Sequence, residues 1–196
     1  MAAAPATDDP DDADLPDDDL AVLARSAPDA FGELYRRYLG PVYRFCLRRV
    51  GAREAAEDAA AQVFLKALGG IATYHPSLGS FRSWLFAIAH RTVVDGYLRH
   101  RPTTSIDAAA EVPDRSRRGS PEETAEHADS AAAVARLLGQ LPDSQRTVVE
   151  LRLAGLTGPE IATALGRSVP SVKLAQFRAY QKLRALLADC PTEDLP

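Results

Sequence analysis

Residues 156–187 have the sequence LTGPEIATALGRSVPSVKLAQFRAYQKLRALL, and this stretch decides the fold. Thr157 and Glu160 have the spacing of a capping box, in which each side chain satisfies a backbone N–H at the start of a helix. Gly166 suits the tight turn that follows, because glycine reaches positive φ without a Cβ clash. Ser168 can then cap a second helix. Two short helices joined by a glycine turn predict a helix-turn-helix.

The second helix of this motif is basic. Its Lys and Arg side chains can neutralise DNA phosphates, while Gln can pair with adenine and Arg with guanine in the major groove. The side chains expected to contact DNA are Arg167, Ser171, Lys173, Gln176, Arg178 and Lys182. Those expected to face inward are Val172, Leu183 and Leu187, with Phe177 or Ala179 between them. The alternative is a solvated basic face on a small helical bundle.

The charge of the chain is unevenly distributed. Residues 1–20 contain eight aspartates and neither lysine nor arginine. Removing these eight from the 27 acidic residues leaves 19 against 23 basic residues, a net charge of +4, although the whole chain carries -4. A basic folded part with an acidic tail indicates a nucleic-acid partner. The tail is predicted to be disordered, and it serves either as a solubilising extension or as a DNA mimic that covers a basic surface.

Several classes of protein are disfavoured by composition. The 196 residues contain no apolar run long enough to span a membrane and no secretory signal, so no membrane insertion is expected. Cys46 and Cys190 are the only cysteines, and no Cys/His cluster has the spacing of a zinc site. These features predict a cytoplasmic protein without a metal or another cofactor.

Three helices are predicted in the first half of the chain. Apolar residues recur at helical spacing over 28–50, where Pro41 should break or kink the helix, and again over 52–68 and 81–101. The inward positions expected on the last two helices are Ala56, Ala60, Val63, Phe64, Ala67, Phe81, Leu85, Ile88, Ala89 and Thr92. Residues 102–128 are rich in Pro, Ser and mixed charge, which predicts a flexible linker.

The predicted fold is therefore all-α, with two small helical modules joined by a tether. The expected divisions are a disordered acidic tail over 1–26, a helical bundle over 27–101, the linker over 102–128, a helix-turn-helix module over 129–187 and a disordered tail over 188–196. Each module is near the lower size limit for a self-sufficient core.

The order of these motifs resembles a known family. The matching pieces of the first module are Phe31, Leu34-Tyr35, Ala56-Glu57-Asp58, Val63-Phe64-Leu65-Lys66-Ala67 and Phe81-Arg82-Ser83-Trp84-Leu85-Phe86. Those of the second are Leu141-Pro142, Gly155-Leu156-Thr157, Glu160-Ile161-Ala162, Leu165-Gly166, Val172-Lys173 and Arg178-Ala179. Together they resemble bacterial RNA polymerase sigma factors of the sigma-70 class, in the extracytoplasmic-function (ECF) group that keeps only regions 2 and 4. The chain departs from the family at Leu174-Ala175, where Ser-Arg is common.

The resemblance implies a protein that binds core RNA polymerase and directs it to promoters. Region 4 would dock on the polymerase flap and recognise the -35 element through the basic helix described above. Region 2 would dock on the polymerase clamp through Glu57, Asp58, Gln62 and Lys66. Region 2 would also capture the opened -10 element, with the residues Tyr74, His75, Ser77, Arg82, Phe86, His90 and Arg91. Single-strand capture needs basic groups along the backbone and an aromatic surface for stacking, and these residue types supply both. An anti-sigma factor is a further expected partner.

Two other functions compete with this interpretation. A stand-alone helix-turn-helix repressor or activator would use the first module for dimerisation. A helical enzyme would use Glu54, Glu57 and Asp58 with histidines, but no paired ligand spacing supports a metal site there.

Overall fold

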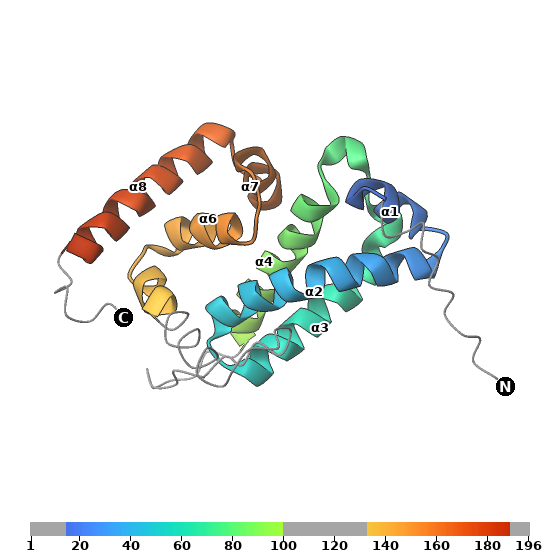
Figure 1. Cartoon of the computed structure of the whole chain (residues 1–196), viewed down its shortest axis with the longest axis horizontal. Helices are drawn as coiled ribbons and strands as arrows, with labels where there is room; N and C mark the ends of the chain where they lie inside the picture. The colour runs from blue at the N-terminus through green and yellow to red at the C-terminus, as the bar shows by residue number, and fades with distance from the viewer. Residues whose placement is uncertain (1–14, 100–132, 189–196) are drawn as a thin grey trace.

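The computed structural model describes residues 15–99 and 133–188, and every regular element in these two ranges is helical. The α-helices are α1 (Asp17–Leu23), α2 (Pro28–Val50), α3 (Arg53–Gly70), α4 (Phe81–Arg99), α6 (Asp143–Leu153), α7 (Gly158–Leu165) and α8 (Val169–Ala188) (Figure 1). Short 3-10 helices, η2 (Ile71–Thr73) and η3 (Pro76–Leu78), lie between α3 and α4, and residues 133–139 are also helical. The predicted all-α fold is confirmed. The predicted linker over 102–128 and the tail beyond residue 188 lie outside the described residues.

We call residues 15–99 the N-terminal bundle, in which α3 packs between α2 and α4. The five inward positions predicted on α3 are all buried, and on α4 only Ile88 is less than fully covered. The rings of Phe45 and Phe86 meet edge to face, with their centroids 5.7 Å apart. The helix predicted over 28–50 is not broken at Pro41, since α2 continues to Val50 and ends at Gly51 with a φ of 77°.

The acidic segment before α2 is partly folded, which corrects the prediction of disorder up to residue 26. Residues 17–23 form α1, and its Leu20 and Ala21 are buried against the bundle. Asp17 forms an ion pair with Arg37 of α2 at 2.8 Å. The local composition favours disorder, but apolar burial and this distant cation stabilise the helix. The other acidic residues of the tail, in the range 1–14, lie outside the described residues.

We call residues 133–188 the C-terminal unit, and it contains the predicted helix-turn-helix. The capping box is present, because the Thr157 backbone N–H donates to Glu160 at 2.8 Å and the Glu160 N–H donates to the Thr157 hydroxyl at 3.4 Å. Gly166 adopts a φ of 62°, and the Ser171 N–H donates to the Ser168 hydroxyl at 3.3 Å. These predictions are therefore confirmed.

The inward face of α8 differs in part from the prediction. Val172 and Ala179 are buried as expected, but Ala175 is also buried while Phe177 and Leu187 are exposed. The helix α6 packs closely against α8. Val172, Ala175 and Ala179 share one face of α8 because they are spaced i, i+3 and i+7, whereas Phe177 lies on the opposite side of the helix.

The two units pack directly against each other and share one core (Figure 1). The sequence predicted two modules, each near the lower size limit for a self-sufficient core. Val148, Leu151 and Ile161 of the second belong to the same buried cluster as the bundle. A smaller cluster lies within the C-terminal unit and consists of Leu138, Leu141, Val149 and Ala179. The main contact is between α4 and α7, and a second one joins α2 to α6. As a result α6 and α7 lie between α8 and the N-terminal bundle, and α8 is on the outside of the molecule.

Candidate nucleic-acid interface

The helix α8 presents a basic face to solvent. Of the six residues predicted to contact DNA, Arg167, Lys173, Arg178 and Lys182 are exposed and Ser171 is partly exposed. No acidic residue occurs between Val169 and Ala188. Gln176 is oriented along the helix, because its Nε2 donates to the Tyr180 hydroxyl at 3.1 Å. A capped helix with one-sided positive charge is the arrangement that a major groove accepts.

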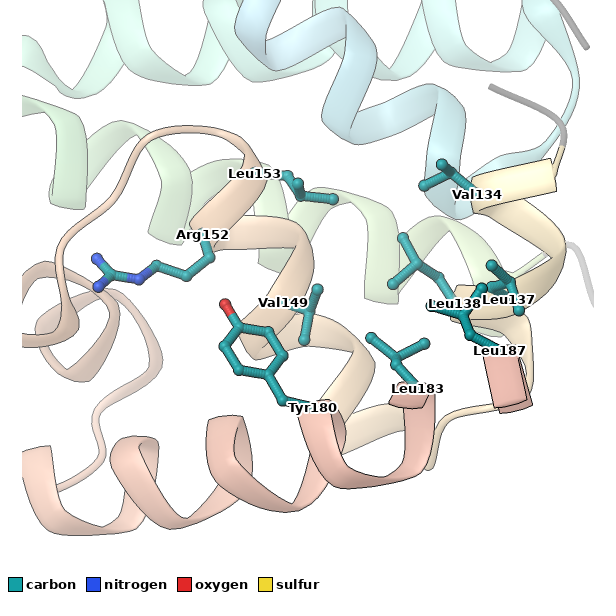
Figure 2. A pocket seen from close by; sticks show the side chains of 9 residues that line it. All are labelled: Val134, Leu137, Leu138, Val149, Arg152, Leu153, Tyr180, Leu183 and Leu187. Atoms are coloured by element: carbon teal, nitrogen blue, oxygen red, sulfur yellow. The ribbon is translucent and has the colours of Figure 1, made fainter. Parts of the chain in front are cut away.

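An apolar groove lies in the same unit, between α6, the C-terminal half of α8 and the helical residues 133–139. It encloses about 430 Å³. Its lining residues are Val134, Leu137, Leu138, Val149, Arg152, Leu153, Tyr180, Leu183 and Leu187 (Figure 2). Leu153 and Leu187 are more than half exposed, so the groove is open to solvent. An exposed apolar groove of this kind is typical of a protein-binding surface.

Two of the residues predicted to stack on single-stranded DNA are core residues. Tyr74 is 1% exposed and Phe86 is fully buried, so neither ring can receive a base, which corrects the prediction for both. The Tyr74 ring packs against Phe81 and Trp84, with centroid distances of 5.8 and 5.6 Å. Its hydroxyl donates to Asp18 at 2.8 Å, and burial raises the pKa of this phenol. Tyr74 therefore anchors α1 and the start of α4.

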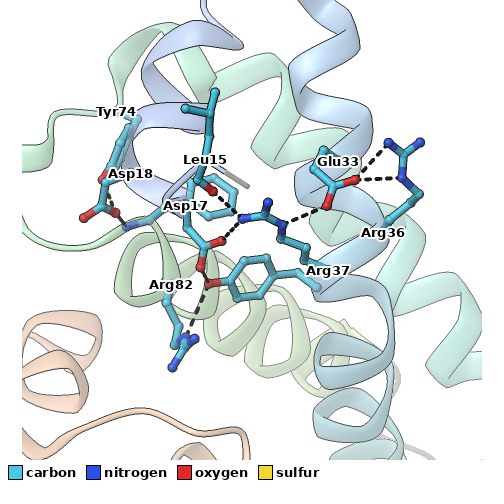
Figure 3. Close-up of polar contacts among 10 residues, drawn as sticks. Leu15, Asp17, Asp18, Glu33, Arg36, Arg37, Tyr74 and Arg82 are labelled. Carbon is cyan, nitrogen blue, oxygen red and sulfur yellow. Dashed lines mark hydrogen bonds and ion pairs between the residues drawn. The ribbon is translucent and has the colours of Figure 1, made fainter. Parts of the chain in front are cut away.

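A chain of polar contacts joins α1 to the C-terminal unit, and Figure 3 shows its part within the N-terminal bundle, from Asp17 to Arg82. Asp17 accepts from the Tyr38 hydroxyl, which in turn accepts from Nε of Arg82 at 3.3 Å. The Nη1 of Arg82 donates to the carbonyl of Gly155 at 3.1 Å. Arg82 was predicted to contact the -10 strand, but in this structure its guanidinium bridges the two units.

The remaining residues predicted for the -10 element lie at the end of the loop and along α4. His75, Ser77 and Arg91 are exposed and available to a DNA strand. His90 is half-buried, and its pKa is lowered, mainly by burial and then by the charge of Arg49. Sequence reasoning missed Leu78, which is 75% exposed at the tip of this loop. Its position between Ser77 and Gly79 is the signal that could have placed it on the surface.

A second polar network closes the interface between the units. Glu150 of α6 is fully buried, and it accepts from Nε of Arg146 at 2.6 Å. Nε of Arg49, from α2, lies 2.9 Å from the other carboxylate oxygen of Glu150. The Ser80 hydroxyl donates to Glu160 at 2.7 Å. Burial alone would raise the pKa of Glu160, but hydrogen bonds from Ser80 and Thr157 outweigh it and lower this pKa.

The exposed face of α3 contains the residues predicted to dock on the polymerase. Glu57, Asp58, Gln62 and Lys66 are all exposed, although Glu57 pairs with Arg53 and Lys66 donates to Thr92. The structure adds two leucines to this face, Leu65 at 69% exposure and Leu68 at 47%. Exposed leucines bordered by charges are typical of a protein-binding surface.

Comparison with known proteins agrees with this geometry. Residues 34–103 match the family described as Sigma-70 region 2, and residues 131–183 match Sigma-70, region 4. The chain is 37% identical over 154 residues to the ECF RNA polymerase sigma factor ShbA of Streptomyces griseus, and the alignment covers 73% of this chain and 80% of ShbA. The chain belongs to the ECF sigma factors. This membership supports a sigma factor over a stand-alone helix-turn-helix repressor.

This ECF sigma factor is also similar to others in sequence and structure. It is 34% identical over 162 residues to BldN of Streptomyces coelicolor, which covers 82% of the chain but only 61% of BldN. A solved structure of CnrH in complex with the cytosolic domain of CnrY matches with a TM-score of 0.70 and 28% identity, over 89% of this chain and 99% of CnrH. RpoE of Bartonella quintana, solved with the anti-sigma factor NepR, matches in fold with a TM-score of 0.63 at 20% identity, over 82% of this chain and 98% of RpoE. Within residues 15–99 and 133–188, no helix of this sigma factor has the length and apolarity to cross a membrane.

Proposed function

We propose that this chain is a promoter-specificity subunit, which binds core RNA polymerase and directs it to promoters with its own -35 and -10 elements. The observation that carries the proposal is the capped, acid-free and outward-facing α8 in a chain that also contains region 2. We infer a cytoplasmic, non-catalytic role, since transcription initiation occurs there and polymerase performs the chemistry.

The -35 element is assigned to α8. Its N-terminal half enters the major groove, where Lys173 and Arg178 contact phosphates or guanine edges, and Arg167 and Lys182 contact the flanking backbone. The support for this assignment is the exposure of these four cations at and along α8.

The -10 element is assigned to the loop before α4. His75, Ser77 and Leu78 extend from it, and Arg91 lies further along α4. Unstacking a base costs a few kcal/mol. Because the rings of Tyr74 and Phe86 are buried, a base cannot stack on them to offset the free energy of unstacking. Contacts with polymerase must therefore offset a larger part of that free energy.

Polymerase is assigned two surfaces. One is the α3 face with Glu57, Asp58, Leu65 and Leu68, and the other is the apolar groove between α6 and α8, which suits a helix of the polymerase flap. An anti-sigma factor is proposed as a regulator, because CnrH was solved with the cytosolic domain of CnrY bound and RpoE, which is similar in fold, with the anti-sigma factor NepR bound.

The test is run-off transcription from a genomic promoter library with purified core polymerase and this chain. Promoter-dependent transcripts that require the chain, and that lose -35 dependence when residues 133–188 are deleted, support the proposal. Tight binding of the free chain to a palindromic duplex, with no transcript from any promoter, would instead establish a repressor.

A further inference from the structure

Two large apolar side chains stand on the exposed face of the proposed recognition helix. Leu174 is 49% exposed and Phe177 is 58% exposed. They are three residues apart, so they share one face of α8 about one turn from each other. Lys173 and Arg178 flank them, and neither residue lines the apolar groove, which uses the C-terminal half of the same helix. A single exposed leucine needs no explanation, but an apolar pair between two DNA-facing cations does.

The two uncharged residues next to this pair, Ala175 and Gln176, are oriented away from its exposed face. Ala175, between the pair, is buried against the rest of the unit. The amide of Gln176 is held by the Tyr180 hydroxyl, toward the C-terminal end of α8. The centre of the helix therefore offers a major groove two hydrocarbon surfaces rather than a hydrogen-bonding amide.

The major groove contains one apolar feature for such a surface, the C5-methyl group of thymine. We propose that Leu174 and Phe177 are specificity-determining residues that contact thymine methyl groups in the -35 element. This inference rests on the proposed function, because it requires α8 to lie in that duplex. Cytosine lacks the methyl group and presents an amino group instead, so the same contacts disfavour it.

The spacing of the two side chains sets where the thymines must lie. Three residues along a helix advance by about 4.5 Å, whereas one base pair advances by about 3.4 Å. The two side chains therefore contact either adjacent base pairs or base pairs separated by one intervening pair. Thymines on either strand satisfy this condition.

The test replaces each -35 thymine by deoxyuridine, which removes only the methyl group. The probe is a promoter obtained from the run-off library, and binding by the assembled holoenzyme is measured by competition. Two of the thymine positions, which lie within a span of three base pairs, should be sensitive to this replacement. At each of them the natural duplex should bind about fourfold more tightly than the duplex with deoxyuridine at that position, as expected for burial of one methyl group. Leu174→Ser should abolish this preference at one of the positions, and Phe177→Ala should abolish it at the other. Both residues are exposed, so both variants should fold normally.

Lys173→Ala is the matched control, because neither a phosphate contact nor a contact to a guanine edge involves the thymine methyl group. It should weaken binding to both duplexes by the same factor. If scrambling the -35 element weakens binding but uridine has no effect, or if both variants retain the full thymine preference, the inference is wrong and the proposed function stands. If Leu174→Ser instead weakens association with polymerase on every template, the pair serves a protein contact and the inference is also wrong. If scrambling the -35 element has no effect, the proposed function fails and the inference fails with it.

Discussion

Replacing Arg49 with methionine should open the contact between the two units. Arg49 belongs to α2, and its side chain is only 7% exposed. It lies 2.9 Å from the fully buried Glu150 and 2.6 Å from Asp143, whose side chain is 77% exposed. Methionine keeps most of the apolar stem of Arg49 and removes its charge. In the closed arrangement Glu150 would then retain one ion pair, with Arg146, and the nearby charge of Arg48.

The expected size of the effect follows from burial. Removing one partner of a buried ion pair costs about 3 to 5 kcal/mol, because the other charge stays buried. The lower value applies here, since neither Arg49 Nε nor Glu150 Oε2 has an aligned hydrogen bond and Arg146 still neutralises the carboxylate. A cost of about 3 kcal/mol raises the equilibrium constant for opening by about two orders of magnitude. Opening relieves this cost, because it returns Glu150 to water.

Asp143→Ala is the matched control, because it removes the other carboxylate that pairs with Arg49. That carboxylate is exposed, so its loss should cost less than about 1 kcal/mol. Urea denaturation should show a much larger fall in the free energy of unfolding for Arg49→Met, and small-angle scattering should show a larger radius of gyration for this variant alone. Equal effects of the two substitutions, or no change in either measurement, would refute the idea that the buried pair holds the units together.

Three further predictions concern individual side chains. Asp18→Ala should lower the free energy of unfolding by about 2 kcal/mol, because Asp18 accepts from the Tyr74 hydroxyl and the Phe81 N–H. The control is Asp19→Ala at the exposed neighbouring position, which should lower the free energy of unfolding by less than about 0.5 kcal/mol. Equal losses for the two variants would contradict the anchoring role of Asp18. Burial lowers the pKa of His90 from 6.5 in the folded protein. The contribution of His90 to stability is therefore complete above pH 6.5 and is lost as the pH falls through the pKa of the folded state. His90→Gln should reduce the fall in the free energy of unfolding with decreasing pH, and an unchanged pH dependence would show that other groups cause that fall. Burial raises the pKa of the Cys46 thiol to about 12. In a Cys190→Ser variant, iodoacetamide should therefore modify Cys46 only after the protein unfolds. Rapid labelling of the native protein would show that this thiol is accessible and would contradict the prediction.

The features that the sequence predicted well depend on neighbours along the chain. The capping box joins Thr157 to Glu160 within one helical turn, and Gly166 adopts the positive φ that its lack of a Cβ permits. The five buried positions of α3 follow from helical periodicity alone. Such signals need no knowledge of the rest of the fold.

The features that the sequence did not predict depend on residues far apart in the chain. Nothing local indicates that Arg49 meets Glu150, or that Asp18 caps the start of α4 and so folds part of an acidic tail. Tyr74 lies in a polar loop, where an exposed ring is a reasonable expectation. It is buried because Phe81 and Trp84 come from α4 to surround it. Candidate contact residues can therefore be proposed from residue type, but their exposure is decided by tertiary packing.

The packing of the two units bears on how the proposed function could work. In the closed arrangement α8 is exposed, whereas Arg82 is held between the Tyr38 hydroxyl and the Gly155 carbonyl. Arg82 is predicted from the sequence to contact the -10 strand, and it cannot do so while it keeps both partners. If that prediction holds, closure and capture of the -10 element compete for the same guanidinium. The apparent affinity of the free chain for DNA is then reduced by the fraction of molecules that are open. A polymerase that binds α3 and the apolar groove at separate sites would favour the open state and release Arg82. On this basis, we expect this ECF sigma factor to recognise the -35 and -10 elements together only when polymerase holds its two units apart.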